Sequence, residues 1–424
     1  MKFSLFLSLF ILSIAYTHSI WGDTIIEHSK KHGYRFLVDG EPFIVKGVAG
    51  DRYLKELKAF GGNTMRTWSI EAQGEEFLDE AHSLGIKVIA GIWVEHARHG
   101  YDYSDRSFVK KQRRQVEAVV KKYKDHPAIL AWGLGNEVEL RLSDEDAEAM
   151  WEEMNELALI VKKADPDHPI MSSVAGFNQE KIDMLQNYFP ELDIIGANAY
   201  GFAPRVGILL KEYGWEKPYM ITEFGPIGHW EEGVRKSEWG APIEETSHEK
   251  AKRYRDAQVA AMDEDSKYCL GTFPFYWSSK QEITTTWFGM FLPGGEHLEA
   301  VDIMSYSWNK KYPKNRVPEI VSLDSKAKLN TVKRRSIQTA SVEVLDHEKD
   351  ELTYHWVLMD ESQEKTVGGD FEKTPTSYPK LILSISGSSV DFKAPRKKGA
   401  YRLFVYVKDT NNGAATANFP FYVD

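Results

Sequence analysis

Short apolar runs alternate with longer amphipathic segments from Phe43 to Trp308. The runs consist of β-branched or other apolar residues, which favours buried strands, and the segments between them place apolar residues at helical spacing. Eight strands are predicted, at 43–48, 64–68, 87–93, 129–133, 170–174, 194–198, 219–222 and 269–275. Helices are predicted between them, such as 106–123, 144–165 and 247–264. Eight such units predict a closed (β/α)8 barrel.

An open, doubly wound sheet is the rival arrangement of alternating strands and helices. Its dinucleotide-binding form needs a Gly-x-Gly-x-x-Gly turn after the first strand, and none follows Phe43–Val48. The closed barrel is therefore favoured. Ahead of it, Tyr34–Phe43 predicts a small hairpin that turns at Asp39-Gly40 and is placed to plug the bottom of the barrel.

The pattern changes after Lys310. Residues 311–318 contain Pro313 and Pro318 and predict a linker. Segments with period-two alternation follow, at 341–344, 352–356, 389–392 and 401–407. They predict a β-sandwich of the immunoglobulin-like kind. The expected fold class is α/β, with a (β/α)8 TIM barrel at 20–310 followed by a small all-β sandwich at 311–424.

The N-terminus predicts export. Met1-Lys2 precedes an apolar run from Phe3 to Ala15, which is too short to cross a bilayer but suits the core of a signal peptide. We expect a signal peptide at 1–19 and a secreted protein, extracellular or periplasmic. No second long apolar stretch predicts a transmembrane span, and the lone Cys269 allows no intrachain disulfide.

Composition narrows the range of partners. The formal net charge is −10 and no long basic stripe could neutralise a phosphate backbone, so nucleic acid is not expected to bind. The 12 tryptophans and 20 tyrosines offer aromatic faces that stack on sugar rings, although most of them are expected in cores. We expect a monomer with a polysaccharide or oligosaccharide as its substrate.

Two glutamates carry the strongest chemical signal. Glu137 ends the segment Ala131–Glu137 just past the fourth predicted strand, and Glu223 ends the seventh. Active groups of such barrels lie at this end, so the two carboxylates are predicted to face one another across the mouth. Cleavage of a glycosidic bond needs one group that protonates the departing oxygen and another that attacks the anomeric carbon or activates water. We predict a separation of about 5 Å, which gives retention of configuration.

The protonation states of the pair follow from their surroundings. The acid needs a raised pKa, which burial beside a second carboxylate supplies. The nucleophile stays ionised if a cation such as Arg66 holds it.

These motifs resemble glycoside hydrolase clan A over residues 43–308. The likeness to the barrel of family 2 enzymes lies in Gly61–Thr67, Leu134–Glu137 and Ile221–Gly225. The likeness to the β-1,3-glucanosyltransferases of family 72 lies in Phe43–Val48, Gly135–Val138, Gly196–Tyr200 and Trp287–Met290. The chain is also similar to endo-β-1,3-glucanases that join a clan A barrel to a C-terminal immunoglobulin-like domain. Residues 340–356 resemble the polycystic-kidney-disease modules of secreted carbohydrate enzymes.

The clan A resemblance implies roles for further residues. It makes Glu137 the acid/base and Glu223 the nucleophile, with Arg66 beneath the nucleophile and Asn136 bonded to the sugar 2-hydroxyl. Tyr200 would orient the nucleophile, and Trp277 would form the floor under the reacting sugar. Weaker candidates for the cleft are Trp68, Trp93, Glu95, His96, Trp230 and Trp287.

A metal site is the alternative interpretation of His96 and His99. Their spacing lacks a third convincing ligand, so a solvated loop is favoured and neither a metal nor a cofactor is expected.

The leading hypothesis is a secreted retaining glycoside hydrolase that acts on β-linked polysaccharide by double displacement. The resemblance alone suggests an endo-β-1,3-glucanase. The alternatives are a β-1,3-glucan transglycosylase, a β-mannanase or another clan A β-glycosidase, and, outside the enzymes, a glycan-binding pseudoenzyme. The C-terminal domain is expected to act as a spacer rather than to bind glycan.

Overall fold

The computed structural model describes residues 24–142, 144–363 and 369–424, so the predicted signal peptide at 1–19 lies outside the described residues. Its central feature is an eight-stranded parallel sheet in which the strands follow their order in the chain. The strands are β4 (Gly47–Ala49), β5 (Thr64–Arg66), β6 (Lys87–Ile92), β7 (Ile129–Asn136), β8 (Ile170–Ala175), β9 (Ile194–Asn198), β10 (Tyr219–Phe224) and β11 (Cys269–Pro274). The last strand, β11, contacts the first, β4, and the Trp277 amide donates to the Ala49 carbonyl at 2.9 Å. The sheet is a nearly closed barrel, and the predicted fold class is confirmed.

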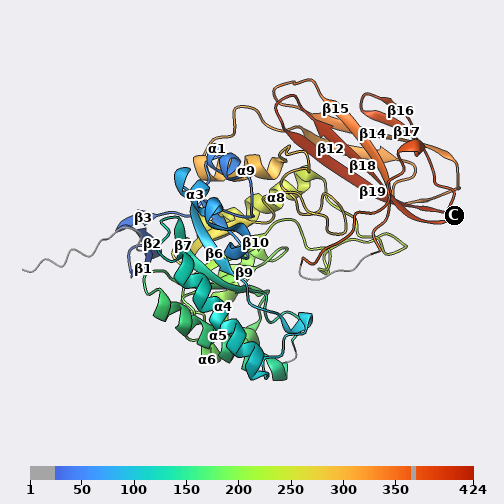
Figure 1. Cartoon of the computed structure of the whole chain (residues 1–424). Helices are drawn as coiled ribbons and strands as arrows, with labels where there is room; N and C mark the ends of the chain where they lie inside the picture. Colours follow the sequence, from blue (N-terminus) through green and yellow to red (C-terminus); the bar gives the residue numbers. More distant parts are fainter. Residues whose placement is uncertain (1–23, 143, 364–368) are drawn as a thin grey trace, which may run out of the picture.

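Helices cover the outside of the barrel (Figure 1). They are α1 (Leu54–Ala59), α2 (Ile70–Gln73), α3 (Glu75–Ser83), α4 (Arg106–Tyr123), α5 (Asp144–Ala164), α6 (Gln179–Tyr188), α7 (Val206–Glu212), α8 (Ser247–Gln258) and α9 (Glu299–Asn309). Local capping explains several of the starts. The Asp105 side chain accepts from the Ser107 amide ahead of α4, and Thr246 and Glu249 form a capping box ahead of α8. The helix predicted at 247–264 ends at Gln258 and continues as a single π-helical segment, Val259–Glu264.

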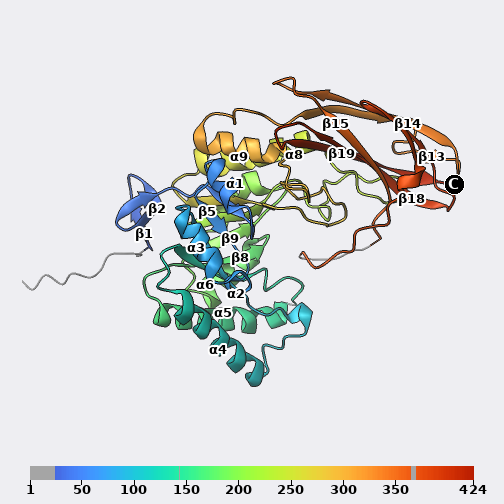
Figure 2. The same cartoon turned by 45° about the horizontal axis from the view of Figure 1, so that its top comes forward.

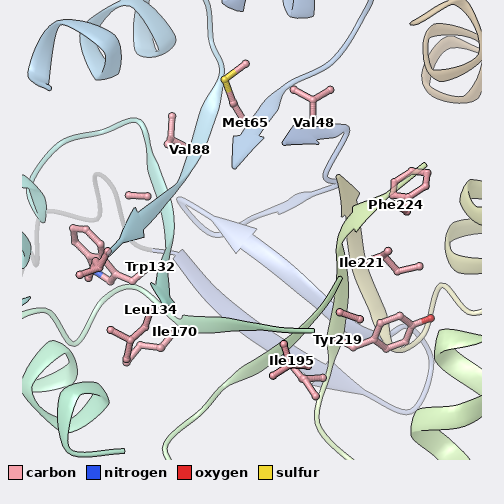
Figure 3. Packing of buried hydrophobic residues seen from close by; sticks show 14 of the residues in the cluster. Val48, Met65, Val88, Trp132, Leu134, Ile170, Ile195, Tyr219, Ile221 and Phe224 are labelled. Carbon is pink, nitrogen blue, oxygen red and sulfur yellow. The ribbon is translucent and has the colours of Figure 1, made fainter. Parts of the chain in front are cut away.

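Apolar side chains between the strands and the helices form the larger core. Figure 3 shows part of it, with Val48, Trp132, Ile195 and Ile221 on four different strands. Trp132 is fully buried, and its indole N–H donates to Asp165 at 2.8 Å, so the polar atom of the largest side chain is satisfied. Cys269 is also buried, as expected for a packed thiol.

A three-stranded antiparallel sheet covers one end of the barrel. It comprises β1 (Thr24–Ser29), β2 (Gly33–Val38) and β3 (Glu41–Phe43), and its tight turn is the predicted one at Asp39-Gly40, where both residues have positive φ. Phe36 packs in the cluster that includes Leu130 and Met171 of the barrel. The hairpin therefore closes the end that lies away from the C-terminal domain in Figures 1 and 2.

The first barrel strand was predicted to start too early. Phe43 pairs with Phe36 in the hairpin, and the barrel strand β4 begins only at Gly47. Gly47 lies against β11, where a Cβ atom would come within 2.4 Å of the Phe273 ring. One apolar run in the sequence thus serves two different sheets.

The C-terminal domain is a sandwich of two four-stranded sheets, ordered β12-β14-β17-β16 and β13-β19-β18-β15. Its strands are β12 (Glu319–Ser325), β13 (Thr331–Val332), β14 (Ile337–Leu345), β15 (Thr353–Asp360), β16 (Ile382–Ser386), β17 (Ser389–Lys393), β18 (Gly399–Lys408) and β19 (Ala414–Val423). The longest strand that the alternation missed is β19, in which almost every residue is buried. Its outer face lies against α8 of the barrel, so the period-two pattern of a half-exposed strand is absent.

The sandwich lies beside the barrel (Figure 2). Leu292 and Leu298 of the barrel side pack with Ala414 of β19, and polar contacts join the two parts as well. Arg402 of β18 donates to the Pro242 carbonyl, Asn418 of β19 donates to Glu244, and the Thr416 amide donates to the Ser247 hydroxyl. None of the helices in the described part of the chain has the length and apolar character that a bilayer span requires.

Candidate active site

The two predicted carboxyl groups lie in one cavity of about 830 Å³ at the carboxyl ends of the barrel strands. Glu223 is the penultimate residue of β10, where it pairs with Asn198 of β9. Glu137 directly follows β7 and has a φ of 52°, a left-handed conformation that residues other than glycine rarely adopt. Its amide donates to the Ser173 carbonyl of β8 at 2.8 Å, which fixes this turn.

Glu223 is held by three donors. Its Oε1 accepts from Arg66 Nη1 at 2.9 Å and from Trp68 Nε1 at 3.1 Å, and its Oε2 accepts from the Tyr200 hydroxyl at 2.9 Å. The side chain is buried, so the Arg66 guanidinium is close in an environment that screens charge weakly. Such an arrangement stabilises an ionised carboxylate and fixes the direction of its oxygens.

Glu137 is placed in the opposite situation. Burial, followed by the negative charge of Glu223, raises the pKa of Glu137 to about 8. The Asn198 amide donates to its Oε1 at 2.7 Å and partly opposes this shift. The Thr222 hydroxyl in turn donates to Asn198 Oδ1 at 2.8 Å, which directs the Asn198 amide nitrogen towards Glu137. Glu137 therefore carries a proton at neutral pH.

A hydrogen-bonded network connects the two carboxyl groups. Arg66 Nη2 donates to Asn136 Oδ1 at 2.5 Å and to the Ser173 hydroxyl at 3.1 Å. Asn198 Nδ2 donates to the same Asn136 oxygen at 3.2 Å. Because the oxygen of Asn136 accepts both bonds, its amide nitrogen is the end that can donate to a ligand in the cavity.

Most of the other predicted residues also surround this cavity. Arg66 lies beneath it, and the lining includes Asn136, Tyr200, Trp68, Trp93, His96 and Trp230. Glu95 is exposed and accepts from the Trp93 indole at 3.3 Å. Segments more than 150 residues apart in the sequence are thus brought together by the ends of the barrel strands.

Trp277 was predicted to form the floor of the site, and the structure corrects this. Its ring is fully buried, packs edge-on against Phe291, and donates to the Tyr53 carbonyl at 3.2 Å. Phe275 and Tyr276 line the cavity instead. The chain turns after β11, so the third residue of Phe-Tyr-Trp points into the protein while the first two face the cavity.

Trp287 lies behind the cavity wall rather than on it. It is buried, donates to the Ile227 carbonyl at 2.9 Å, and meets the His229 ring edge-on. Trp287 therefore supports His229, and it is His229 that lines the cavity.

His96 does not lie in a solvated loop. It is 2% exposed, stacks on both Trp93 and His99, and accepts a hydrogen bond at Nδ1 from Arg98. Burial, followed by the positive charge of Arg98, lowers the pKa of His96 to about 4. The imidazole is therefore neutral at neutral pH and serves as a flat packing surface beneath Trp93.

Sequence reasoning did not single out Asn198, which contacts Glu137, or Ser173, which contacts Arg66. Both lie on predicted strands, and Asn198 precedes Tyr200 by only two residues in the segment that carried the resemblance. The position of each at a strand end is the signal that could have identified it. A second group that was missed comes from the C-terminal domain, where Gly369–Glu372 also line the cavity.

Comparison with known proteins finds a family model that matches part of the barrel. Residues 52–238 match the family described as glycosyl hydrolases family 2, TIM barrel domain. This match covers less than half of the chain and lies within the barrel. The comparisons give no support to the likeness to family 72 or to the endo-β-1,3-glucanases. A search of curated proteins found no match.

Solved structures of similar fold include two β-glucuronidases and a putative β-galactosidase. A β-glucuronidase from Bacteroides uniformis has a TM-score of 0.51 and 13% identity, with 95% of this chain and 48% of that one covered. A Bifidobacterium dentium β-glucuronidase has a TM-score of 0.52 and 17% identity, with 68% and 50% covered. A putative β-galactosidase from Bacteroides fragilis has a TM-score of 0.50 and 16% identity, with 95% and 57% covered.

The chain spans about half the length of these three structures. At such identities the likeness shows the fold.

Proposed function

We propose that the protein hydrolyses a β-linked neutral glycan with retention of configuration at the anomeric carbon. The observation that carries this proposal is one cavity with two glutamates in different surroundings: burial beside a second carboxyl group raises the pKa of Glu137 to about 8, and Glu223 pairs with the Arg66 guanidinium at 2.9 Å. Such a division of roles is what a double displacement requires.

Each step uses groups already in place. A Glu223 oxygen attacks the anomeric carbon while the Glu137 proton passes to the departing glycosidic oxygen, which leaves as an alcohol. Glu137, now ionised, takes a proton from a water molecule, and that water displaces Glu223 from the anomeric carbon. The second step restores both starting states and releases a sugar with its original configuration. Asn136 lines the cavity, and we expect its amide to donate to a sugar hydroxyl during both displacements.

The charges around the cavity favour a neutral sugar over an acidic one. Arg98 pairs with Asp370 at 3.0 Å and Lys280 pairs with Glu282 at 3.3 Å, so each of these cations faces an acid of the chain itself. Glu231 adds a further acid to the lining. The carboxylate of a uronate would lose its bound water on entering the cavity. Because each of these cations already pairs with an acid of the chain, the lost hydration would not be replaced by a new ion pair, and binding would be weaker.

The substrate can be identified with a panel of aryl glycosides. We expect turnover of the 4-nitrophenyl β-glycoside of glucose, galactose or mannose, and turnover at least about tenfold slower with the β-glucuronide. Laminarin is the first polymer to test, because the sequence resemblance points to β-1,3-glucan. Products shorter than the substrate indicate hydrolysis, whereas longer ones indicate transfer to a second sugar. Fastest turnover of the glucuronide would contradict the neutral-sugar proposal, and no turnover of any compound would contradict the enzyme.

Export is a further part of the proposal. Its support is the apolar run after Met1-Lys2, which lies outside the described residues. N-terminal sequencing of the protein from the culture medium or periplasm of its host should find a new terminus near residue 20. Recovery of the protein only inside the cell with Met1 intact would contradict export.

The rate should depend on pH through Glu137. The group acts as an acid and has a pKa of about 8, so kcat/KM should stay level from neutral pH and fall as pH rises through about 8. Glu137→Gln removes this proton donor and should abolish the alkaline limb along with most of the activity towards substrates with poor leaving groups. The pH profile of kcat/KM for an aryl glycoside measures this effect. An alkaline limb that persists unchanged in Glu137→Gln would show that another group supplies the proton.

Tyr200→Phe tests the orientation of the nucleophile. The change removes one of three donors to Glu223 and leaves the ring in its contacts with Trp230 and Phe275. We expect kcat to fall about 10²-fold, because a misdirected nucleophile loses the geometry of attack. Circular dichroism and the urea unfolding midpoint should stay close to those of the wild type. A kcat within twofold of the wild-type value would exclude an orienting role for the hydroxyl.

A further inference from the structure

One wall of the cavity is built by the C-terminal domain. Gly369–Glu372, which follow β15 in the sequence, line the cavity together with Trp93 and Trp230. The domain was expected to act as a spacer, yet these residues face the same space as Glu137 and Glu223.

Gly369–Glu372 is fastened to two separate loops of the barrel. On one side, Asp370 pairs with Arg98 at 3.0 Å and with His99 at 3.5 Å, both in the loop that follows β6. On the other side, the buried Glu372 accepts from the Ile283 amide at 2.6 Å, and Lys280 donates to the Gly369 carbonyl at 3.2 Å. These two loops flank the cavity. The ion pairs and hydrogen bonds to them therefore hold Gly369–Glu372 at its edge.

Phe371 lies between these anchors and is 89% exposed. Leaving a phenylalanine ring in water forgoes about 2–3 kcal/mol of burial that the fold could otherwise gain. Asp370 and Glu372, its neighbours in the sequence, are both bonded to the barrel, so the backbone at Phe371 is fixed beside the cavity. The rings of Trp93 and Trp230 are also exposed at this cavity, at 39% and 56%. Exposed aromatic faces around a cavity are suited to the apolar faces of sugar rings.

We propose that Phe371 stacks on a sugar of the bound glycan next to the one that is cleaved, which makes the C-terminal domain part of the substrate site. The proposal rests on the proposed function for the identity of the ligand as a neutral glycan. It is independent of the catalytic roles of Glu137 and Glu223. Phe371 would then contribute to the binding of oligosaccharides and not to that of small aryl monoglycosides, which occupy the reacting position alone.

Binding without turnover tests this directly. Glu137→Gln mimics the protonated acid, so it preserves the neutral charge of that position while preventing cleavage. Laminarihexaose, cellohexaose and mannohexaose are titrated into this variant by calorimetry, and then into the same variant carrying Phe371→Ala. We expect the hexaose that binds to lose about tenfold in affinity with Phe371→Ala and to keep its affinity with Phe371→Tyr. Ile385→Ala, an exposed apolar residue of the same domain outside the cavity lining, is the matched control.

Two further measurements separate stacking from a general change in the fold. Asp370→Asn keeps the ring but weakens the anchor to Arg98, and it should give a smaller loss of affinity than Phe371→Ala. In the otherwise wild-type protein, Phe371→Ala should raise KM for the hexaose about tenfold and leave kcat and the aryl monoglycoside kinetics unchanged.

The outcomes distinguish this proposal from the proposed function. A dissociation constant that is equal in Phe371→Ala and Ile385→Ala would overturn the role of the ring, and so would the failure of all three hexaoses to bind. Lack of turnover in the wild type would overturn the hydrolase, while the calorimetric comparison would still decide the role of Phe371.

Discussion

Replacing Glu223 with alanine is expected to lower kcat by about 10⁴-fold or more, the largest effect on activity among the changes considered. The variant loses the atom that forms the covalent bond, and the Arg66 guanidinium is left without its carboxylate partner. Both consequences act on the same step, because the buried cation then opposes the positive charge that develops on the sugar ring. The measurement is the rate of release of 4-nitrophenol from the best aryl glycoside of the panel.

Added azide assigns the two glutamates to their roles through the configuration of the product. In Glu223→Ala, azide occupies the space of the missing carboxylate and attacks from that side, so the glycosyl azide has inverted configuration. In Glu137→Ala, the covalent intermediate still forms with an aryl leaving group that needs no proton, and azide displaces Glu223 from the opposite side with net retention. NMR of the two products distinguishes the anomers. Exchange of the two stereochemical outcomes would reverse the roles assigned here.

Glu223→Gln separates the enzyme from a glycan-binding pseudoenzyme. The amide keeps the size of the carboxylate but cannot form the covalent bond, so turnover should vanish while a hexaose still binds. Equal behaviour of this variant and the wild type in every turnover assay would favour the pseudoenzyme.

Part of the site could be predicted because barrel topology converts position along the chain into position in space. Asn136, Glu137 and Glu223 stand at the carboxyl ends of runs of buried, mostly apolar residues, and the carboxyl ends of parallel strands meet at one edge. This rule says which residues reach the mouth without any knowledge of the loops. The roles expected of Arg66 and Tyr200 came instead from the resemblance to clan A.

The rule fails once the chain leaves the strand. Trp277 stands only three residues beyond β11, yet the turn there places Phe275 and Tyr276 on the cavity and Trp277 in the core. Alternation within a strand cannot predict the direction of a side chain after the strand ends.

Contacts between the domains could not be predicted from the sequence, for a different reason. Arg98 and Asp370 are separated by 272 positions and meet only because the sandwich packs on the barrel in one orientation. No local periodicity encodes that orientation. The fully buried strand β19 shows the same effect, since contact with α8 removes the alternation by which strands are recognised.

Arg402→Met is expected to cause the largest loss of stability, about 3–5 kcal/mol in the free energy of unfolding of the sandwich. Arg402 is fully buried and forms two hydrogen bonds to Glu361, at 2.9 and 2.6 Å, and one to Asn418 at 2.6 Å. Methionine fills much of the volume but leaves the carboxylate of Glu361 buried without its cation. The cost is that of an uncompensated buried charge rather than that of the lost contact alone.

Urea unfolding followed by tryptophan fluorescence measures the effect, and a double variant tests its cause. Arg402→Met with Glu361→Leu removes both charges and should recover most of the loss, because the unpaired carboxylate is gone. Lys398→Met is the matched control, since Lys398 pairs with Asp424 at 3.4 Å on the surface and its loss should cost less than about 1 kcal/mol. A double variant as unstable as the single one would show that Arg402 acts through packing instead of charge.

The same variant connects stability to the substrate site. Arg402 also donates to the Pro242 carbonyl of the barrel at 2.7 Å, so its loss weakens the interface that holds the sandwich in place. Gly369–Glu372 depends on that interface for its position over the cavity. Under conditions in which Arg402→Met remains folded, hexaose affinity should therefore fall while aryl monoglycoside turnover stays within about twofold of the wild-type rate. If hexaose affinity and aryl monoglycoside turnover fell by equal factors, the interface would support the barrel as a whole. It would then not act only through the position of Phe371.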